Sequence, residues 1–272
     1  MPICKLPALP VLIAAVLASA QLAVATAEAQ QSGDPRIAEL TQAGKIRVGL
    51  FPPQYVKDSA TREIRSAWVE IARALARRMG LEAVMLERRT PPEAVACLKS
   101  ADCDLLFLPF DERAAEVGDF SHPILQFEYT LLVPTGSRVR KIADADQPGT
   151  RIAAVRNHGS TMTLIPLLKH ATLTYAETPK PTFDLLQSAQ ADVMASTRNA
   201  LLEFSDQLPG SRVLEDHYGA NINRMVVPKG KAGWLAYVNE FVEEAKASGL
   251  VQKAIDRVGP RGLTVPAPGD AK

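Results

Sequence analysis

The feature that most constrains the fold is an alternation of short apolar runs with amphipathic helical segments. Strand-like runs lie at 46–51, 83–86 and 104–108, and helical patterns lie between them at 64–79 and 92–98. This order indicates βαβ units, because two parallel strands need a crossover connection, which is usually a helix. The first part of the chain therefore predicts an α/β structure with a parallel sheet.

The same alternation starts again at residue 129. We expect strands at 129–133, 151–155, 173–175, 192–195 and 224–227, and helices at 160–168, 182–188, 199–208, 234–246 and 249–258. Two such sets without a long linker predict two lobes that share one ligand cleft. Ligand sites in such sheets lie at the carboxyl ends of strands, here after Leu50, Leu108, Val155 and Ala195.

The start of the chain has the layout of a secretory signal peptide. Lys5 precedes an apolar run at 9–17, and small residues follow it with cleavage motifs at 25–27 and 27–29. The run is too short to span a bilayer comfortably, and Cys4 precedes it, whereas a lipoprotein cysteine would follow it. We expect export to the periplasm with cleavage near residues 27–29. An uncleaved anchor helix is the alternative.

The charge balance and the scattered histidines exclude several kinds of partner. Lys and Arg total 31 and Asp and Glu total 30, for a net charge of +1. The charges are spread along the chain, whereas a nucleic-acid binder would concentrate basic residues on one face. Four histidines and the two cysteines left after the leader make no cluster with metal-ligand spacing. We expect no nucleic acid, no metal and no cofactor.

The two remaining cysteines, Cys97 and Cys103, lie close together in the sequence. The periplasm permits disulfides, and a bond here would join the end of one helix to the next strand. Two buried free thiols are the alternative, because the sequence does not give the Cα separation.

A motif after the strand at 104–108 carries a resemblance to a known family. It reads Asp-Glu-Arg at 111–113 and then Asp-Phe-Ser-His-Pro at 119–123. In these residues the chain resembles the family 3 extracellular solute-binding proteins, the amino-acid-type receptors of ABC importers. Their hallmark is an acidic-Arg pair after a strand, followed by Asp-Phe-Ser-x-Pro. The likeness extends from Ile46 to about Val258.

The resemblance implies a type II periplasmic-binding-protein fold, with two α/β lobes joined by two hinge strands. The hinge crossings would lie near 127–130 and 222–227. The chain would divide into a signal peptide, a discontinuous first lobe, a second lobe and a loose tail, at 1–29, 30–128 plus 226–262, 129–225 and 263–272.

The resemblance also implies capture and delivery without catalysis. A monomer would bind a small molecule between its lobes, close over it and dock on an ABC permease in the inner membrane. Enzymes are the first alternative, because relatives of this fold include dehydratases acting on prephenate-like acids; Glu128 or Asp216 would then be the acid. Sensing through a membrane receptor or kinase is the second.

Arg113 is the residue that would grip a ligand carboxylate in such a receptor. A guanidinium offers a rigid, permanently charged fork that matches two carboxylate oxygens. The alternative is a surface arginine paired with Asp111 or Glu112.

A turn of Gly159, Ser160 and Thr161 would supply the matching half of the clamp on the second lobe. Hydroxyl and backbone donors at a helix start favour an anion, although serine or threonine caps are commonplace. His158 and Ser160 together do not indicate a hydrolase, because no G-x-S-x-G elbow accompanies them.

Departures from the family pattern bear on the ligand. Amino-acid receptors carry a serine or threonine where this chain has Phe110, and an acid for the ligand ammonium where it has Thr197, next to Arg198. The first strand also ends at Phe51 without an acid. Since an ammonium without a counter-charge is costly to desolvate, an ordinary α-amino acid fits poorly.

We therefore expect an anionic ligand, such as a mono- or dicarboxylate or an acidic amino-acid derivative. The basic residues on loops expected to face the cleft are Arg113, Arg156, His158 and Arg198. The alternative is that the arginines at 156 and 198 point outward or pair with Glu203 or Asp206. Aromatic residues that would form an apolar wall, or pack in the core, are Phe51, Tyr55 and Phe110.

Overall fold

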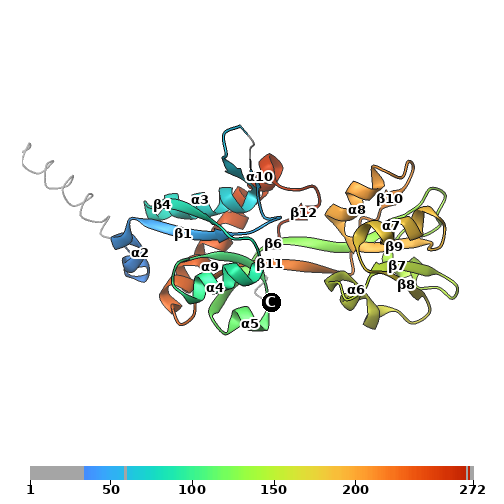
Figure 1. The fold of residues 1–272 in the computed structure, drawn as a ribbon, viewed down its shortest axis with the longest axis horizontal. Coiled ribbons are helices and arrows are strands. Elements are labelled where there is room, and N and C mark those ends of the chain that lie inside the picture. Colours follow the sequence, from blue (N-terminus) through green and yellow to red (C-terminus); the bar gives the residue numbers. More distant parts are fainter. Residues whose placement is uncertain (1–33, 58–59, 268, 270–272) are drawn as a thin grey trace, which may run out of the picture.

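The computed structural model describes residues 34–57, 60–267 and 269. The expected signal peptide lies outside these residues. The chain forms two lobes that lie side by side along the long axis of the molecule (Figure 1). Two long strands, β6 (Gly118–Val133) and β11 (Gly219–Pro228), run from one lobe into the other. Within the described ranges, no helix combines the length and the apolar character that a membrane span requires.

The first lobe has the strand and helix alternation that the sequence predicted. Its elements are η1 (Pro35–Ile37), α2 (Ala38–Ala43), β1 (Lys45–Leu50), β2 (Val56–Lys57), β3 (Ile64–Arg65), α3 (Ala67–Met79), β4 (Glu82–Glu87), α4 (Pro91–Lys99), β5 (Leu106–Pro109), α5 (Glu112–Ala115) and, after the second lobe, α9 (Ala232–Ala247), α10 (Leu250–Val258) and β12 (Leu263–Thr264). Strands β1 and β4 pair in parallel, and a parallel bridge between Val48 and Leu105 brings the chain before β5 alongside them.

Helix α3 starts later than the apolar pattern predicted. The Ser66 side chain accepts a hydrogen bond from the Val69 amide and so caps the helix before Ala67. Ile64 pairs instead with Lys57 in the short β2–β3 hairpin. The apolar face of α3 packs on β1 and on the terminal helices, and forms the core of the first lobe.

The second lobe is a continuous segment with helices on both faces of its sheet. Its elements are η2 (Ile142–Ala145), β7 (Arg151–Val155), α6 (Gly159–Leu164), η3 (Ile165–Leu167), β8 (Thr172–Ala176), α7 (Pro179–Gln187), β9 (Val193–Thr197), α8 (Arg198–Ser205) and β10 (Arg212–Val213). Leu131 packs with Leu164 of α6, whereas its neighbour Leu132 packs with Phe183 and Leu201 of α7 and α8. Adjacent strand residues point to opposite faces, so one strand supplies both cores.

A single sheet connects the lobes. Its strand order is β5-β11-β6-β9-β7-β8, with β10 and β12 also paired to β6. In the first lobe β11 pairs with β5, and in the second lobe β6 pairs with β9 from Tyr129 to Leu132. The crossings therefore lie at 125–129 and 219–223. The second crossing begins before the expected segment 222–227. The reason is that β11 begins at Gly219, ahead of residues 224–227, where the sequence predicts the strand.

The segment after α10 differs from the expected loose tail. Leu263 and Thr264 form β12 and pair with Phe127 and Gln126 of the hinge strand β6. Leu263 is buried in the core of the first lobe. Pairing with β6 and burial of Leu263 hold the segment in place. The proline- and glycine-rich composition does not indicate these contacts.

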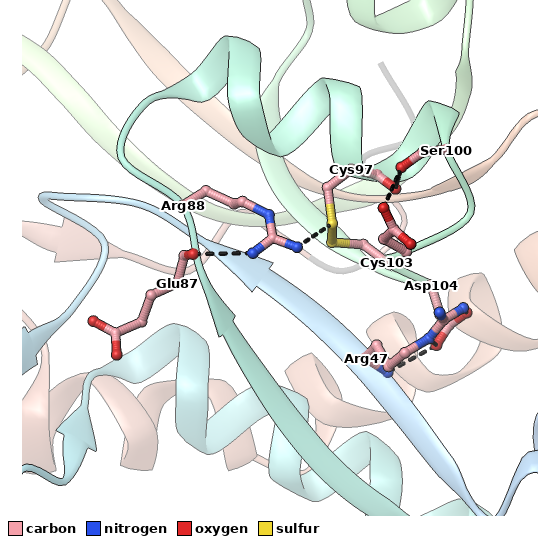
Figure 2. Close-up of a disulfide and its surroundings, with 8 residues drawn as sticks. Arg47, Glu87, Arg88, Cys97, Ser100, Cys103 and Asp104 are labelled. Carbon is pink, nitrogen blue, oxygen red and sulfur yellow. Dashed lines mark hydrogen bonds and ion pairs between the residues drawn. A yellow bond between two sulfur atoms is a disulfide. The ribbon is translucent and has the colours of Figure 1, made fainter.

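Cys97 and Cys103 are joined by a disulfide in the first lobe (Figure 2). The bond connects the last turn of α4 to the residues before β5, with a Cα–Cα distance of 5.3 Å. Arg88 lies against it, with its guanidinium 3.0 Å from Cys97 Sγ. Asp104, the residue after Cys103, accepts hydrogen bonds from the Arg47 side chain and backbone amide. The disulfide thus ties the end of α4 to the residues that lead into β5.

Candidate ligand-binding cleft

A cavity of about 790 Å³ lies where the two lobes meet the hinge strands. Side chains from the first lobe, the hinge, the second lobe and the C-terminal segment line it: Phe51, Pro53, Gln54, Trp68, Pro91, Pro92, Val95, Leu108, Pro109, Asp111, Arg113, Ala114, Phe127, Asn199, Glu203, Asn221, Asn223 and Pro260. A site built from both lobes is one that hinge motion can open and close.

The first-lobe wall of the cavity is mostly apolar. Trp68, at the start of α3, is 4% exposed and its ring centroid lies 6.1 Å from that of Phe127 in the hinge. Phe51, the residue after β1, extends this wall. Gln54 is buried beside it and donates from Nε2 to the Phe107 carbonyl over 2.6 Å. The wall can therefore pack against a hydrocarbon or ring portion of a ligand.

Arg113 brings a cation to this cavity from the short helix α5. Its side chain is 90% exposed, and its nearest carboxylate oxygen, Asp111 Oδ2, is 3.8 Å away. Asp111 itself caps α5, since its Oδ1 accepts a hydrogen bond from the Ala114 amide. The guanidinium is thus presented to solvent in the cleft with a weakly engaged partner, and its fork can accept a carboxylate.

The second lobe lines the cavity with α8. Asn199 and Glu203 lie four residues apart on this helix, so their side chains share one face. Glu203 is exposed. The sequence suggested Glu203 only as a partner for an arginine. Helix α8 begins where β9 ends, and Asn199 and Glu203 are spaced to share one face of it. This spacing is the sequence signal that could have identified them.

The α6 turn does not line the cavity. Ser160 is 1% exposed and its Oγ lies 2.8 Å from His158 Nδ1, while Thr161 Oγ1 donates to the Val155 carbonyl over 2.7 Å. Gly159 is pressed against Tyr129, whose hydroxyl would lie 2.8 Å from an added Cβ. The hydroxyls expected to face a ligand therefore bond within the lobe. Burial lowers the pKa of His158, which favours its neutral form beside Ser160.

Two of the predicted basic residues have protein partners away from the cavity. Arg156 Nε lies 2.8 Å from Glu177, and its guanidinium lies over the Tyr175 ring. Arg198 is 12% exposed and donates to Glu128 over 2.8 Å. Neither pairs with the acids that the sequence suggested. Glu177 is the residue after β8 and Glu128 lies in the hinge strand β6, so no local spacing links these carboxylates to the arginines.

The other predicted residues also lie outside the cavity lining. Thr197 ends β9 opposite Tyr129 and precedes α8. Tyr55 donates from its hydroxyl to Glu87 over 3.0 Å, and burial raises its pKa. Phe110 is 64% exposed, with its ring 5.3 Å from that of Phe120.

The acids considered for a dehydratase are engaged elsewhere. Glu128 pairs with Arg198, and its other oxygen lies 3.9 Å from His217. Asp216 accepts a hydrogen bond from the Ile142 amide over 2.8 Å. Neither lines the cavity. Within the described ranges, no group of three or more potential ligands could hold a metal ion.

Two α/β lobes, joined by paired hinge strands around a shared cleft, define the type II periplasmic-binding-protein fold. The family model for bacterial extracellular solute-binding proteins, family 3, matches residues 47–259. The chain belongs to this family.

Solved structures with the same fold include proteins of two kinds. An ancestral cationic amino acid solute-binding protein superposes with a TM-score of 0.62 at 19% identity, covering 81% of this chain and 98% of that one. An ancestral cyclohexadienyl dehydratase gives 0.61 at 22% identity, covering 82% and 95%. The putative binding component of an ABC transporter from Wolinella succinogenes, complexed with lysine, gives 0.58 at 20%, covering 79% and 95%. No curated protein sequence matches the chain. At these identities the likeness concerns the fold.

Proposed function

We propose that this protein captures a small carboxylate of amino-acid type between its lobes and delivers it to an ABC permease. The observation that carries the proposal is Arg113, a highly exposed guanidinium in a cavity lined from both lobes. The fork would bind the carboxylate through two charge-assisted hydrogen bonds. Trp68 and Phe51 would contact the body of the ligand.

The charges of the cleft favour a ligand that carries a cation as well as a carboxylate. The charged residues in the cavity lining are one arginine, Arg113, and two acids, Asp111 and Glu203. A dicarboxylate would meet this surplus of negative charge, whereas an ammonium could pair with Glu203. Glu203 of α8 would supply the acid that the sequence seemed to lack. Relatives of the same fold are described as bound to lysine or L-arginine, which agrees with this ligand class.

Binding would be coupled to closure of the lobes. Rotation about 125–129 and 219–223 would bring α8 toward α5, enclose the ligand and exclude water. Low local polarity would then strengthen both ion pairs. The signal peptide would direct export of the protein to the periplasm. There the closed form would dock on the permease.

We prefer transport to catalysis because neither acid considered for a dehydratase, Glu128 or Asp216, lines the cleft. A dehydratase would require a general acid within reach of its substrate. Glu128 is held by Arg198, and Asp216 lies at a backbone amide outside the cavity.

A thermal-shift screen of the mature protein tests the proposed ligand class. L-amino acids, amines and mono- and dicarboxylates are compared for the native chain, Glu203→Gln and the exposed control Glu215→Gln. A ligand that binds the folded state raises the melting temperature with its concentration over Kd. We expect amino acids to stabilise the native chain and the control more than Glu203→Gln. Stabilisation by dicarboxylates alone would refute this ligand class and support the anionic one.

A further inference from the structure

The C-terminal segment makes contact with both lobes across the hinge. After α10, the chain turns at Pro260, and the Arg261 guanidinium donates to Asp206 Oδ2 in the second lobe over 2.8 Å. Gly262 follows, and then β12 returns along β6 beside the crossing (Figure 1). The segment belongs to the first lobe, and its apex at Pro260 to Gly262 thus reaches the second lobe.

Both ends of this segment are fixed to the first lobe. On one side it continues from α10, which packs on α3. On the other side, Gly269 N donates to Glu243 over 2.8 Å and Lys246 Nζ donates to the Ala267 carbonyl over 3.3 Å. Leu263 is buried between these anchors. The apex therefore cannot follow the second lobe freely when that lobe rotates.

The apex fits closely against the start of α8. Gly262 has φ +77, and a Cβ there would lie 3.0 Å from both Arg198 Cγ and the Asn199 amide nitrogen. This is a backbone conformation and a contact that only glycine accommodates without strain. Pro260 and Asn199 both line the cavity. The segment thus adjoins the second-lobe wall of the cleft at the residues that would meet a ligand.

We propose that residues 259–267 form an interlobe strap that holds the cleft open and positions α8. The strap contacts are made in an arrangement in which Arg113 is 90% exposed, so they favour the open form. Rotation of α8 about the hinge must change them, because the strap is fixed to the other lobe. A contact made in one of two states shifts the population toward that state. Weakening the strap should therefore favour closure. The inference rests on the proposed hinge closure and not on the identity of the ligand.

The test compares Arg261→Ala with Arg257→Ala. Arg257 is an exposed arginine one turn earlier whose ion pair with Glu70 lies within the first lobe. Nitroxide labels at exposed positions 116 and 169, one on each lobe, report the interlobe distance of the ligand-free protein by pulsed electron paramagnetic resonance. We expect a larger short-distance population for Arg261→Ala and an unchanged distribution for Arg257→Ala. The exchanged pair Arg261→Asp with Asp206→Arg should restore the native distribution.

Ligand titration supplies a second measurement. For the amino acid that stabilises the native chain most, the Kd of Arg261→Ala should fall by about two- to fivefold, the effect expected from an exposed ion pair. An unchanged or longer interlobe distance in Arg261→Ala would overturn the strap. Because the distance is measured without ligand, that result can be told apart from failure of the proposed ligand class, which would leave the distance shift intact.

Discussion

The Arg198 guanidinium lies 2.8 Å from the Glu128 carboxylate and ties the start of α8 to the hinge strand β6. Two further nitrogen atoms of Arg198 donate to the carbonyls of Leu214 and Glu215, each over 2.7 Å. Arg198 was expected to face the ligand, but its guanidinium is fully engaged by groups of the protein. Its charge is balanced within the second lobe and the hinge.

Replacing Arg198 should cost stability much more than replacing Arg156. Arg198→Ala leaves the largely buried Glu128 carboxylate without its partner, which should lower the free energy of unfolding by about 3 kcal/mol. Arg156 pairs at the surface with Glu177, and Arg156→Ala should cost about 1 kcal/mol or less. Urea unfolding of the two variants measures the difference. Equal losses would mean that the Arg198 pair is no more important than a surface contact.

Gly159→Ala should destabilise the second lobe. The new methyl group would lie 2.8 Å from the Tyr129 hydroxyl, inside van der Waals contact, and overpacking of this kind costs about 1–3 kcal/mol. Tyr129→Phe removes that oxygen, so Gly159→Ala should cost less in the phenylalanine background. A double-mutant cycle by urea unfolding gives the coupling. Additive losses would show that the α6 turn does not depend on the tyrosine.

Glu243 should make stability depend on acid pH. Burial alone would raise its pKa, but hydrogen bonds from Gly269, Lys246 and His122 lower it from 4.5 to about 2. A carboxyl whose folded pKa is depressed stabilises the protein above its unfolded pKa and ceases to do so as pH falls through the folded one. This contribution should be complete above pH 4.5 and disappear toward pH 2.

Urea unfolding at pH 7 and pH 3 checks the Glu243 contribution. Glu243→Gln should lose less stability between these two pH values than the native chain does. The neighbouring exposed Glu244→Gln serves as the control and should retain the native difference. If Glu243→Gln keeps the full native difference as well, another group is responsible for the acid sensitivity.

The disulfide should contribute to stability through the unfolded chain. Its cysteines are separated by six positions in the sequence, and a loop of this size corresponds to about 2 kcal/mol in the chain-entropy model. The double variant Cys97→Ser, Cys103→Ser should unfold at correspondingly lower urea concentration. The native protein with dithiothreitol should match it. A native chain insensitive to the reductant, with the double variant equally stable, would exclude this contribution.

The sequence predicted the order of strands and helices because each element carries its own pattern. The βα alternation gave the two lobes, and the motif at 111–123 pointed to Arg113, which lies on the short helix α5 and lines the cavity. Helix starts were less accurate. The cap by Ser66 shortened α3 relative to its apolar pattern.

Side-chain partners could not be predicted in the same way. Glu128 and Tyr129 come from the hinge strand β6, and Glu177 follows β8; these residues determine that Arg198, Gly159 and Arg156 face protein groups. Counting along the strand from Asp192 gives Thr197 at the position where the family pattern has an acid. Glu203, the second-lobe acid that lines the cleft, comes from the next helix.

The most direct measurement is isothermal titration calorimetry of the mature protein with the amino acid that stabilises it most in the thermal-shift screen. The native chain is compared with Arg113→Ala and with Arg156→Ala, an arginine of equal charge outside the cavity. We expect Arg113→Ala to raise the Kd by about tenfold to a hundredfold, the effect of losing hydrogen bonds to a charged group, and Arg156→Ala to leave it unchanged. Native affinity in Arg113→Ala would contradict the proposed carboxylate site.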